Sequence, residues 1–235
     1  MMSFSPLRLV GLAVVAAACV SVSACLDAGG TPEIVVGVAA GQPDQAVLGE
    51  LIARQLAGRD AATVRVDAVE AAGGEDMIDH LSAGTIDVAV ICTGETLAQL
   101  NPQAASTAAA NLHNSVAAEN RPGPVELTYD ATLASLPGGI GVTDSVGGEG
   151  CRSADGPLPN NVLPVFRSSR IDRDLWWSLD LLAERLDTVT LQKLSAAVDA
   201  GASPAQVADE FYRAALVDEA FEEQAREFAE HPRWL

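Results

Sequence analysis

The feature that most constrains the fold of this chain is a stretch from Glu33 to Leu100, in which short apolar runs alternate with segments of helical periodicity. The apolar runs are residues 34–38, 64–69 and 86–91. Runs of this kind predict strands, and strands that alternate with helices of about 10–15 residues indicate βαβ units and a parallel sheet. The predicted fold class is therefore α/β, with a parallel or mixed sheet flanked by helices.

Each of the two helical segments carries one apolar face. The apolar residues are Val47, Leu48, Leu51, Ile52 and Leu56 in the first segment and Met77, Ile78 and Leu81 in the second. Ligands of open α/β sheets bind at the carboxyl ends of the strands. Those ends fall at residues 39–42 and 92–95, so the predicted ligand-binding residues are Gly41, Gln42, Thr93, Gly94 and Glu95. Glu95 also suits the first turn of a helix that starts at Thr93.

The last third of the chain predicts helices. The first covers residues 171–186, with Asp172 or Asp174 at its amino end, and one of its two tryptophans, at 176 and 177, is expected in the core. A threonine, at 188 or 190, is expected to cap the next helix, which ends near residue 201. Ser203 and Gln206 form a capping box for a third helix, and residues 218–230 predict a final charged helix.

The order of these elements carries a family resemblance. A strand that ends in Gly37 is followed by a helix, a second strand, the sequence LSAGTIDV at 81–88 and Cys92-Thr93-Gly94. This order resembles the substrate-binding proteins of glycine betaine, choline and osmoprotectant ABC importers, which carry L-x-x-G-x-I-D followed by an aromatic residue, Thr and Gly. Residues 162–216 are similar to the last segment of the same family. Together these parts cover a little over half of the mature chain.

The resemblance implies a type II periplasmic-binding-protein-like fold, in which two lobes enclose a small quaternary-ammonium or other polar solute. It also implies an ABC permease as partner and a role without catalysis. The sequence itself also indicates a role without catalysis. Glu95 has no predicted carboxylate or histidine partner, and no catalytic constellation is indicated. The glycines Gly37 and Gly41 lack the further glycines and the lysine of a nucleotide-binding loop, so no cofactor is expected.

The chain departs from the two-lobe pattern after Asp144. From Pro137 to Asn160, 14 of 24 residues are Gly, Pro, Ser or Asp, which predicts a loop. A βαβ unit needs about 30 residues, but only residues 145–161 separate Asp144 from the returning strand predicted at 162–166. We therefore expect a single lobe over 33–235, with the Gly/Pro-rich loop 137–160 in place of the second lobe. Residues 101–125 are expected to form a helix end and a long connection, and residues 126–136 a helix.

The first 24 residues read as a lipoprotein signal peptide. Their apolar run, 9–20, is too short to span a bilayer, and it ends in Val22-Ser23-Ala24-Cys25, which resembles a lipobox. Lipidation of Cys25 would anchor the protein to the outer face of the cytoplasmic membrane, with residues 25–32 as a tether. The alternative is an ordinary cleaved signal without a lipid.

The charge of the chain excludes some partners. The formal net charge is −18. Arg8 is the only charged residue before position 25, so the mature charge is −19. This acidity argues against nucleic acid as a partner and against electrostatic adhesion to anionic lipids.

Cysteine usage predicts a disulfide. Cys19 and Cys25 belong to the signal region, which leaves Cys92 at a strand end and Cys151 in the Gly-rich loop. Two thiols in an exported chain usually pair; the alternative is a buried free Cys92 and an unpaired Cys151. The chain has no CxxC motif and no His–Cys cluster with the spacing of a zinc site, so no metal is expected.

Two functional hypotheses follow. The first is an extracytoplasmic solute-binding lipoprotein of an osmoprotectant ABC transport system. The second is a one-lobe descendant that no longer captures solute and acts as an interaction or structural protein of the cell envelope. Aromatic residues discriminate between them, because quaternary ammonium groups are bound by aromatic cages. Between Glu33 and Thr128 the chain has no Phe, Tyr or Trp, and Cys92 stands where the family has an aromatic residue.

Overall fold

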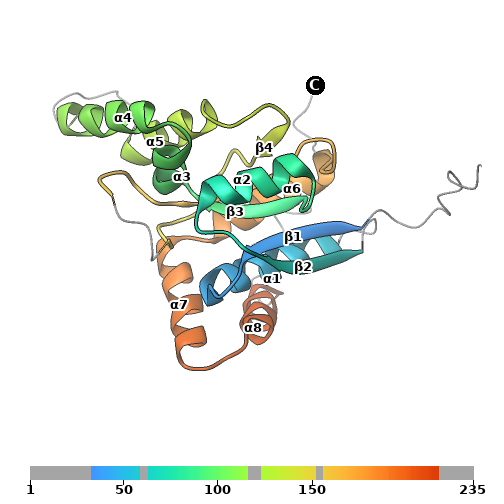
Figure 1. Cartoon of the computed structure of the whole chain (residues 1–235). Helices are drawn as coiled ribbons and strands as arrows, with labels where there is room; N and C mark the ends of the chain where they lie inside the picture. The colour runs from blue at the N-terminus through green and yellow to red at the C-terminus, as the bar shows by residue number, and fades with distance from the viewer. Residues whose placement is uncertain (1–32, 59–62, 116–122, 152–155, 217–235) are drawn as a thin grey trace, which may run out of the picture. The chain divides into compact units, whose positions relative to one another are not determined.

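The computed structural model describes residues 33–58, 63–115, 123–151 and 156–216 (Figure 1). They belong to one unit, Thr31–Leu235. The predicted signal peptide, the tether and the predicted helix at 218–230 lie outside the described residues.

A five-stranded mixed sheet forms the centre of this unit, with the order β2-β1-β3-β5-β4. Its strands are β1 (Ile34–Ala39), β2 (Val64–Val69), β3 (Val88–Cys92), β4 (Ile140–Val142) and β5 (Val162–Arg167). β1 pairs in parallel with β2 and β3, whereas β5 runs antiparallel to β3 and β4 antiparallel to β5. The predicted α/β class, with a parallel or mixed sheet flanked by helices, is confirmed, and residues 162–166 return into the sheet as expected.

Eight helices are described around the sheet. They are α1 (Pro43–Ala57), α2 (Gly74–Ala83), α3 (Thr93–Leu100), α4 (Pro102–Ser115), α5 (Pro124–Leu133), α6 (Arg173–Arg185), α7 (Thr188–Asp199) and α8 (Pro204–Leu216). The apolar residues predicted to share one face of α1 and one face of α2 are all buried. The helix expected to start at Thr93 is α3, with Glu95 in its first turn.

The two faces of the sheet are covered by different helices. On β3, Val88 and Val90 pack into a cluster with α1, α6, α7 and α8, whereas Ala89 and Ile91 pack into a second cluster with α2. Figure 1 shows α1 and α2 on opposite sides of the sheet. Because successive side chains of a strand point to opposite faces, a continuous apolar run is what a strand buried on both sides requires.

Four local predictions are corrected by the structure. Residues 102–115, expected to be a helix end and a connection, form the full helix α4. The helix expected at 126–136 lies at 124–133, and the short strand β4 lies within the segment expected to be only loop. The cap of α7 is Asp187, whose carboxylate accepts a hydrogen bond from the Thr190 N–H at 2.7 Å, rather than either threonine. Asp187 is the better acceptor because its carboxylate is charged.

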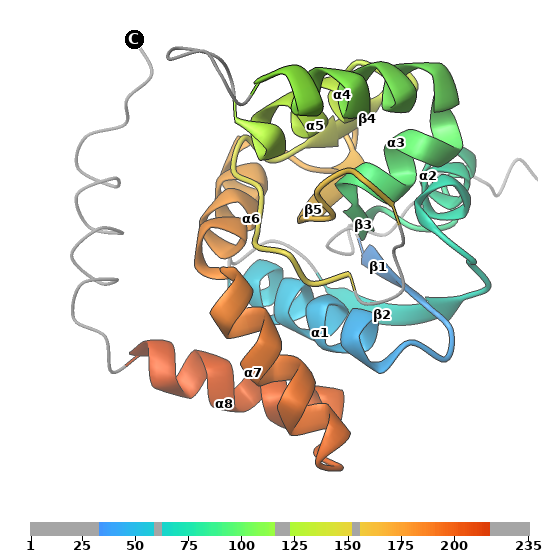
Figure 2. The same cartoon turned by 90° about the vertical axis from the view of Figure 1, so that its left-hand side faces the viewer.

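The C-terminal helices pack on the same unit as the first strands. Figure 2 shows α7 and α8 beside α1. The Tyr212 hydroxyl of α8 donates to the Leu51 carbonyl of α1 at 2.9 Å. The predicted capping box is present, with the Ser203 N–H donating to Gln206 Oε1 at 3.1 Å. Of the two tryptophans, Trp176 packs against the core, and its indole N–H donates to the Val142 carbonyl at 3.0 Å.

A buried carboxylate joins three strand segments at the amino end of β3, away from the predicted ligand-binding residues that follow this strand. Asp87 is 4% exposed and precedes β3. Its Oδ1 atom lies 3.1 Å from Arg167 Nη1 and 3.0 Å from Arg170 Nε. Its Oδ2 atom accepts a hydrogen bond from the Val35 N–H at 3.0 Å. The network therefore ties the start of β3 to β1 and to the end of β5.

Both tyrosines of the chain are expected to resist ionisation. Burial raises the pKa of Tyr129 from 10.0 to about 12, and the carboxylates of Asp144, Asp130 and Asp180 add to the effect. Burial also raises the pKa of Tyr212. The folded state holds these protons more tightly, so stability is unaffected below the ordinary tyrosine pKa and declines as pH rises above it.

An alkaline titration of phenolate absorbance tests this expectation. The folded protein should show little phenolate at pH values where the chain in denaturant ionises both tyrosines. Tyr129→Phe leaves Tyr212 as the only phenol and separates the two. Ionisation of both groups at the ordinary pKa in the folded protein would contradict the burial described here.

Candidate functional site

The predicted ligand-binding residues lie at one edge of the sheet. β1 and β3 are adjacent and parallel, so Gly41 and Gln42 after β1 and Thr93–Glu95 after β3 follow carboxyl ends that face the same way. Gly41 is exposed and has φ +73, a left-handed conformation that glycine adopts without strain. Gln42 is the N-cap residue of α1, but its side chain makes no capping hydrogen bond. The fold therefore brings both parts of the predicted site to one edge.

A segment of the chain's own Gly/Pro-rich loop covers the start of α3. This segment, residues 158–161, is called the strap below. The antiparallel register pairs Cys92 with Val162. The residues that precede β5 must therefore lie next to the residues that follow β3. The first such contact extends the ladder, with the Thr93 N–H donating to the Asn161 carbonyl at 3.0 Å.

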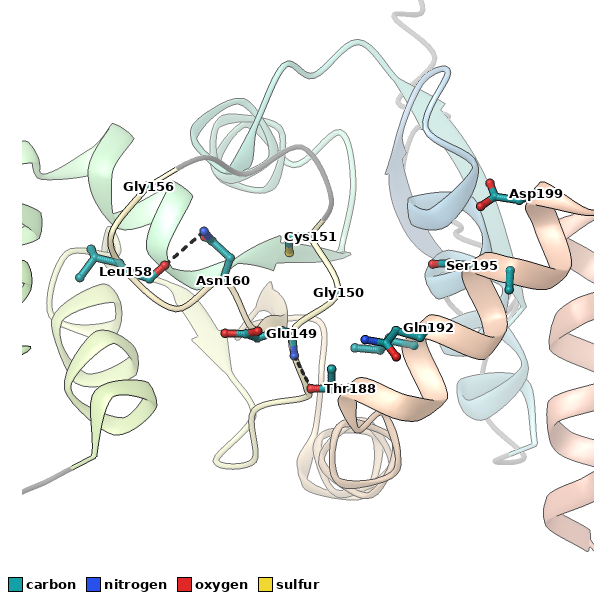
Figure 3. A pocket seen from close by; sticks show the side chains of 12 residues that line it. Glu149, Gly150, Cys151, Gly156, Leu158, Asn160, Thr188, Gln192, Ser195 and Asp199 are labelled. Atoms are coloured by element: carbon teal, nitrogen blue, oxygen red, sulfur yellow. Dashed lines mark hydrogen bonds between the residues drawn. The ribbon is translucent and has the colours of Figure 1, made fainter.

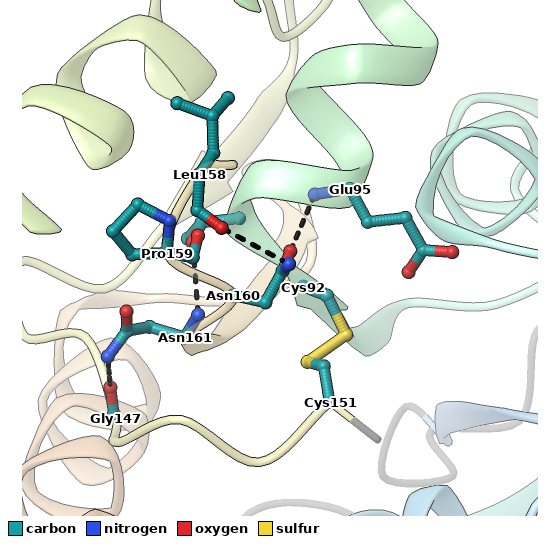
Figure 4. The surroundings of a disulfide bond; sticks show 9 residues. Cys92, Glu95, Gly147, Cys151, Leu158, Pro159, Asn160 and Asn161 are labelled. Atoms are coloured by element: carbon teal, nitrogen blue, oxygen red, sulfur yellow. Dashed lines mark hydrogen bonds between the residues drawn. A yellow bond between two sulfur atoms is a disulfide. The ribbon is translucent and has the colours of Figure 1, made fainter. Parts of the chain in front are cut away.

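The strap satisfies the polar groups of the first turn of α3 (Figure 4). The Pro159 carbonyl accepts from the Gly94 N–H at 3.1 Å and from the Thr93 hydroxyl at 3.0 Å. The Asn160 carboxamide oxygen accepts from the Glu95 N–H at 2.7 Å. The Thr93 hydroxyl in turn accepts from the Asn161 N–H at 3.2 Å. Thr93, Gly94 and the Glu95 backbone are thus bound to protein groups.

Close packing accompanies these hydrogen bonds. A Cβ atom added to Gly94 would lie 2.7 Å from the Pro159 carbonyl oxygen and 2.8 Å from the Leu158 Cβ, so this position accepts only glycine without movement. Leu158 is 7% exposed and packs with Leu97, Ala105 and Ala108 in a third apolar cluster. Gly94, which is expected to contact a ligand, is in contact with the strap in this structure.

Glu95 contributes a carboxylate beside the strap. Figure 4 shows its side chain extending away from Asn160. Burial raises the pKa of Glu95 above its ordinary value. A carboxylate with a raised pKa gains from a nearby cation, which would favour its ionised form.

The predicted disulfide between Cys92 and Cys151 is confirmed. The two Cα atoms lie 5.9 Å apart and the S–S distance is 2.00 Å. The bond joins the end of β3 to the Gly-rich loop upstream of the strap (Figure 4). Among the described residues, no group of three His, Cys, Asp or Glu side chains is placed to hold a metal ion. No helix in the described part of the chain is long and apolar enough to cross a membrane.

One cavity lies on each side of the strap. The larger, of about 490 Å³, opens toward α7 and is shown in Figure 3. Its described lining consists of Glu149, Gly150, Cys151, Gly156, Leu158, Asn160, Thr188, Leu191, Gln192, Ser195, Ala196 and Asp199. The smaller, of about 330 Å³, is lined by Gly94, Leu158, Asn160 and small residues of α3 and α4. Leu158 and Asn160 line both cavities, so the strap is the wall between them.

Two aromatic residues line a pocket elsewhere in the described part of the chain. Phe166 and Trp176 border an open pocket of about 360 Å³ between β5 and α6, together with Asp144, Asp172 and Arg173. The described linings of the two cavities beside the strap contain no aromatic side chain. An aromatic cage for a quaternary ammonium group is therefore not formed by the described residues at the strand ends.

The sequence interpretation missed the strap residues Pro159 and Asn160. Their role depends on the register between β3 and β5, which is a contact between residues about 70 positions apart. A usable signal was present, because the predicted return of residues 162–166 beside the strand at 86–91 already brings the preceding residues toward Thr93. Placing the loop required the antiparallel direction of this pair, which local periodicity does not specify.

The fold is shared with two solved structures. The apo form of YehZ from Escherichia coli is 12% identical to this chain, with a TM-score of 0.52. A glycine betaine/carnitine/choline ABC transporter is also 12% identical, with a TM-score of 0.54. Each alignment covers 77% of this chain and 98% of the other. No protein-family model and no curated protein sequence matches the chain. The likeness confirms at the level of fold the resemblance that the sequence carries.

Proposed function

We propose that this chain is an extracytoplasmic, non-catalytic solute-binding protein of the class that serves osmoprotectant ABC importers. The observation that carries the proposal is the shared fold, which aligns with 98% of a glycine betaine/carnitine/choline ABC transporter chain. In this proposal a lipid on Cys25 holds the protein at the outer face of the cytoplasmic membrane. Its partner is an ABC permease, and its solute is a small polar or quaternary-ammonium compound.

The proposed solute site is the strand-end edge, with Gly41, Gln42, Thr93, Gly94 and Glu95. We further propose that the chain is a single lobe, which leaves one face of the solute in water and so limits the affinity of this site. Polar contacts made in high dielectric contribute little, and ordering the solute costs free energy. The proposal therefore includes a partner protein that supplies the missing wall.

A second candidate function is favoured by the strap. Because the first turn of α3 is hydrogen-bonded to Pro159, Asn160 and Asn161, the end of β3 is occupied without any solute. In this alternative the protein has lost solute capture and serves as an interaction or structural protein of the cell envelope. The two candidates differ in one measurable property, which is saturable solute binding at the strand ends.

We expect the isolated soluble form, beginning at Asp27, to bind glycine betaine or choline no more tightly than about 1 mM. The physical reasons are the open face and the absence of an aromatic wall among the described residues at the strand ends. Isothermal titration calorimetry measures the affinity, and amide chemical shifts of Gly41, Gln42 and Glu95 locate the site.

A saturable millimolar shift of these amides, reduced by Glu95→Ala, would support the solute-binding class. Complete absence of a shift with either compound would support the second candidate. A micromolar dissociation constant that is lost in Glu95→Ala would contradict the expected weakness and indicate that one lobe suffices for capture. Glu75→Ala, which changes an exposed carboxylate on α2, is the matched control.

A further inference from the structure

We propose that the strap is an internal occupant of the strand-end site and keeps a solute carboxylate away from the first turn of α3. The inference rests on the proposed solute-binding function, because it describes the state in which that site is found. Its central contact places the Asn160 carboxamide oxygen 2.7 Å from the Glu95 backbone nitrogen.

The first N–H groups of a helix have no partner within the helix. In α3 the strap supplies partners for three of them in succession. The Thr93 N–H donates to the Asn161 carbonyl, the Gly94 N–H to the Pro159 carbonyl and the Glu95 N–H to Asn160 Oδ1. Proline carries no N–H of its own, so Pro159 offers this turn only an acceptor. All three donors are thus unavailable to an anionic group from solution.

Other contacts hold the strap in place independently of the Asn160 side chain. Leu158 is buried against Leu97, Ala105 and Ala108, and the residue after the strap, Val162, begins β5. The disulfide fixes Cys151 on the upstream side. Shortening the side chain of Asn160 therefore frees the Glu95 donor and leaves the strap attached.

The space released by such a change matches a carboxylate in size. A carboxamide and a carboxylate have the same number of heavy atoms and nearly the same shape. Asn160 lines the cavities on both sides of the strap, so the remainder of a small solute can extend from this position. Gly94 is too close to Pro159 for a solute atom to enter between them. A solute can therefore reach this turn only at the position that the carboxamide leaves.

The test compares Asn160→Ala with Asn160→Asp in the soluble form beginning at Asp27. The probes are glycine betaine, which carries a carboxylate, and choline, which carries the same cation without one. In Asn160→Ala we expect faster hydrogen exchange of the Glu95 amide and glycine betaine binding that is tighter by about tenfold, the value of one hydrogen bond to a charged group. Choline binding should not change. Asn160→Asp keeps an acceptor in place and should therefore gain no preference for glycine betaine over choline.

Three results would overturn the inference. Faster exchange of the Glu95 amide without tighter glycine betaine binding would show that the strap blocks nothing, and equal tightening for choline would show that no carboxylate position was opened. The inference also fails if the wild type binds glycine betaine as tightly as Asn160→Ala does. In that case the proposed solute-binding function still stands. Absence of saturable binding in every form would instead remove the proposed function itself. If Asn160→Ala does not fold, Asn160→Gly carries the same comparison.

Discussion

Replacing Asp87 with alanine is expected to lower the free energy of unfolding by about 3 kcal/mol. The carboxylate is 4% exposed and bonds Arg167, Arg170 and the Val35 N–H. Its removal leaves the Val35 N–H without this acceptor and two guanidinium groups without their shared anion. Both arginine side chains are 31% exposed, so water replaces part of the loss, which places the value at the lower end for a broken buried pair.

Urea unfolding followed by circular dichroism measures this effect. Asp79→Ala is the matched control, because Asp79 is exposed on α2, and its removal should change stability by less than about 0.5 kcal/mol. Arg167→Ala and Arg170→Ala should each cost less than Asp87→Ala, since the other arginine remains beside the carboxylate. Equal stability of Asp87→Ala and wild type would show that the network contributes nothing to the fold.

Removing the Cys92–Cys151 disulfide is expected to lower stability by roughly 4 kcal/mol in the chain-entropy model. The bond joins two residues with a sequence separation of 59. The closed loop leaves the unfolded chain far fewer conformations than it has without the bond. The variant Cys92→Ala/Cys151→Ala removes both sulfur atoms and leaves no reactive thiol at this site. Its thermal midpoint should fall clearly below that of the oxidised wild type.

Reduction of the wild type provides the control for this prediction. With dithiothreitol the wild type should approach the stability of the double variant, because both then lack the cross-link. Cys92 is 5% exposed, so any further difference between the two reflects the packing of the side chain at this position. A double variant as stable as the oxidised wild type would show that the bond does not restrict the unfolded chain in the expected way.

The strands and the first two helices could be predicted because burial imposes a repeating pattern on their residues. β3 is covered on both faces, so its five residues are all buried and its run of apolar residues is continuous. α1 and α2 each bury one face, which is why their apolar residues recur at helical spacing.

The helix α4 escaped prediction because its buried side chains are small. Ala105 and Ala108 face the third cluster, and alanine on both faces of a helix produces little contrast in hydropathy. A local signal was nevertheless present, since the Asn101 side chain accepts a hydrogen bond from the Ala104 N–H at 3.0 Å, as an N-cap residue does. An Asn-Pro pair before an alanine-rich segment is thus better read as a helix start.

The placement of residues 41–42 and 93–95 at one edge of the sheet could be predicted, but the segment that covers residues 93–95 could not. The rule that ligands bind at strand ends depends only on chain direction, and it brought residues 41–42 and 93–95 to one edge. Whether that edge is open depends on where the loop at 137–160 lies. This is decided by the long-range pairing of Cys92 with Val162 and by the burial of Leu158. Glycine, proline and asparagine identify a loop, but they do not tell what the loop covers.

The two outer strands of the sheet carry features that disfavour pairing with a strand of another molecule. β2 carries Arg65 and Asp67, which pair with each other, and Arg65 Nε lies 3.1 Å from Glu33 Oε2. At the other side, β4 contains only three residues. The charged side chains on β2 disfavour the addition of a strand from another molecule. The shortness of β4 has the same effect at the other side of the sheet. Copies crowded side by side on a surface would thus remain separate molecules rather than join into a continuous sheet.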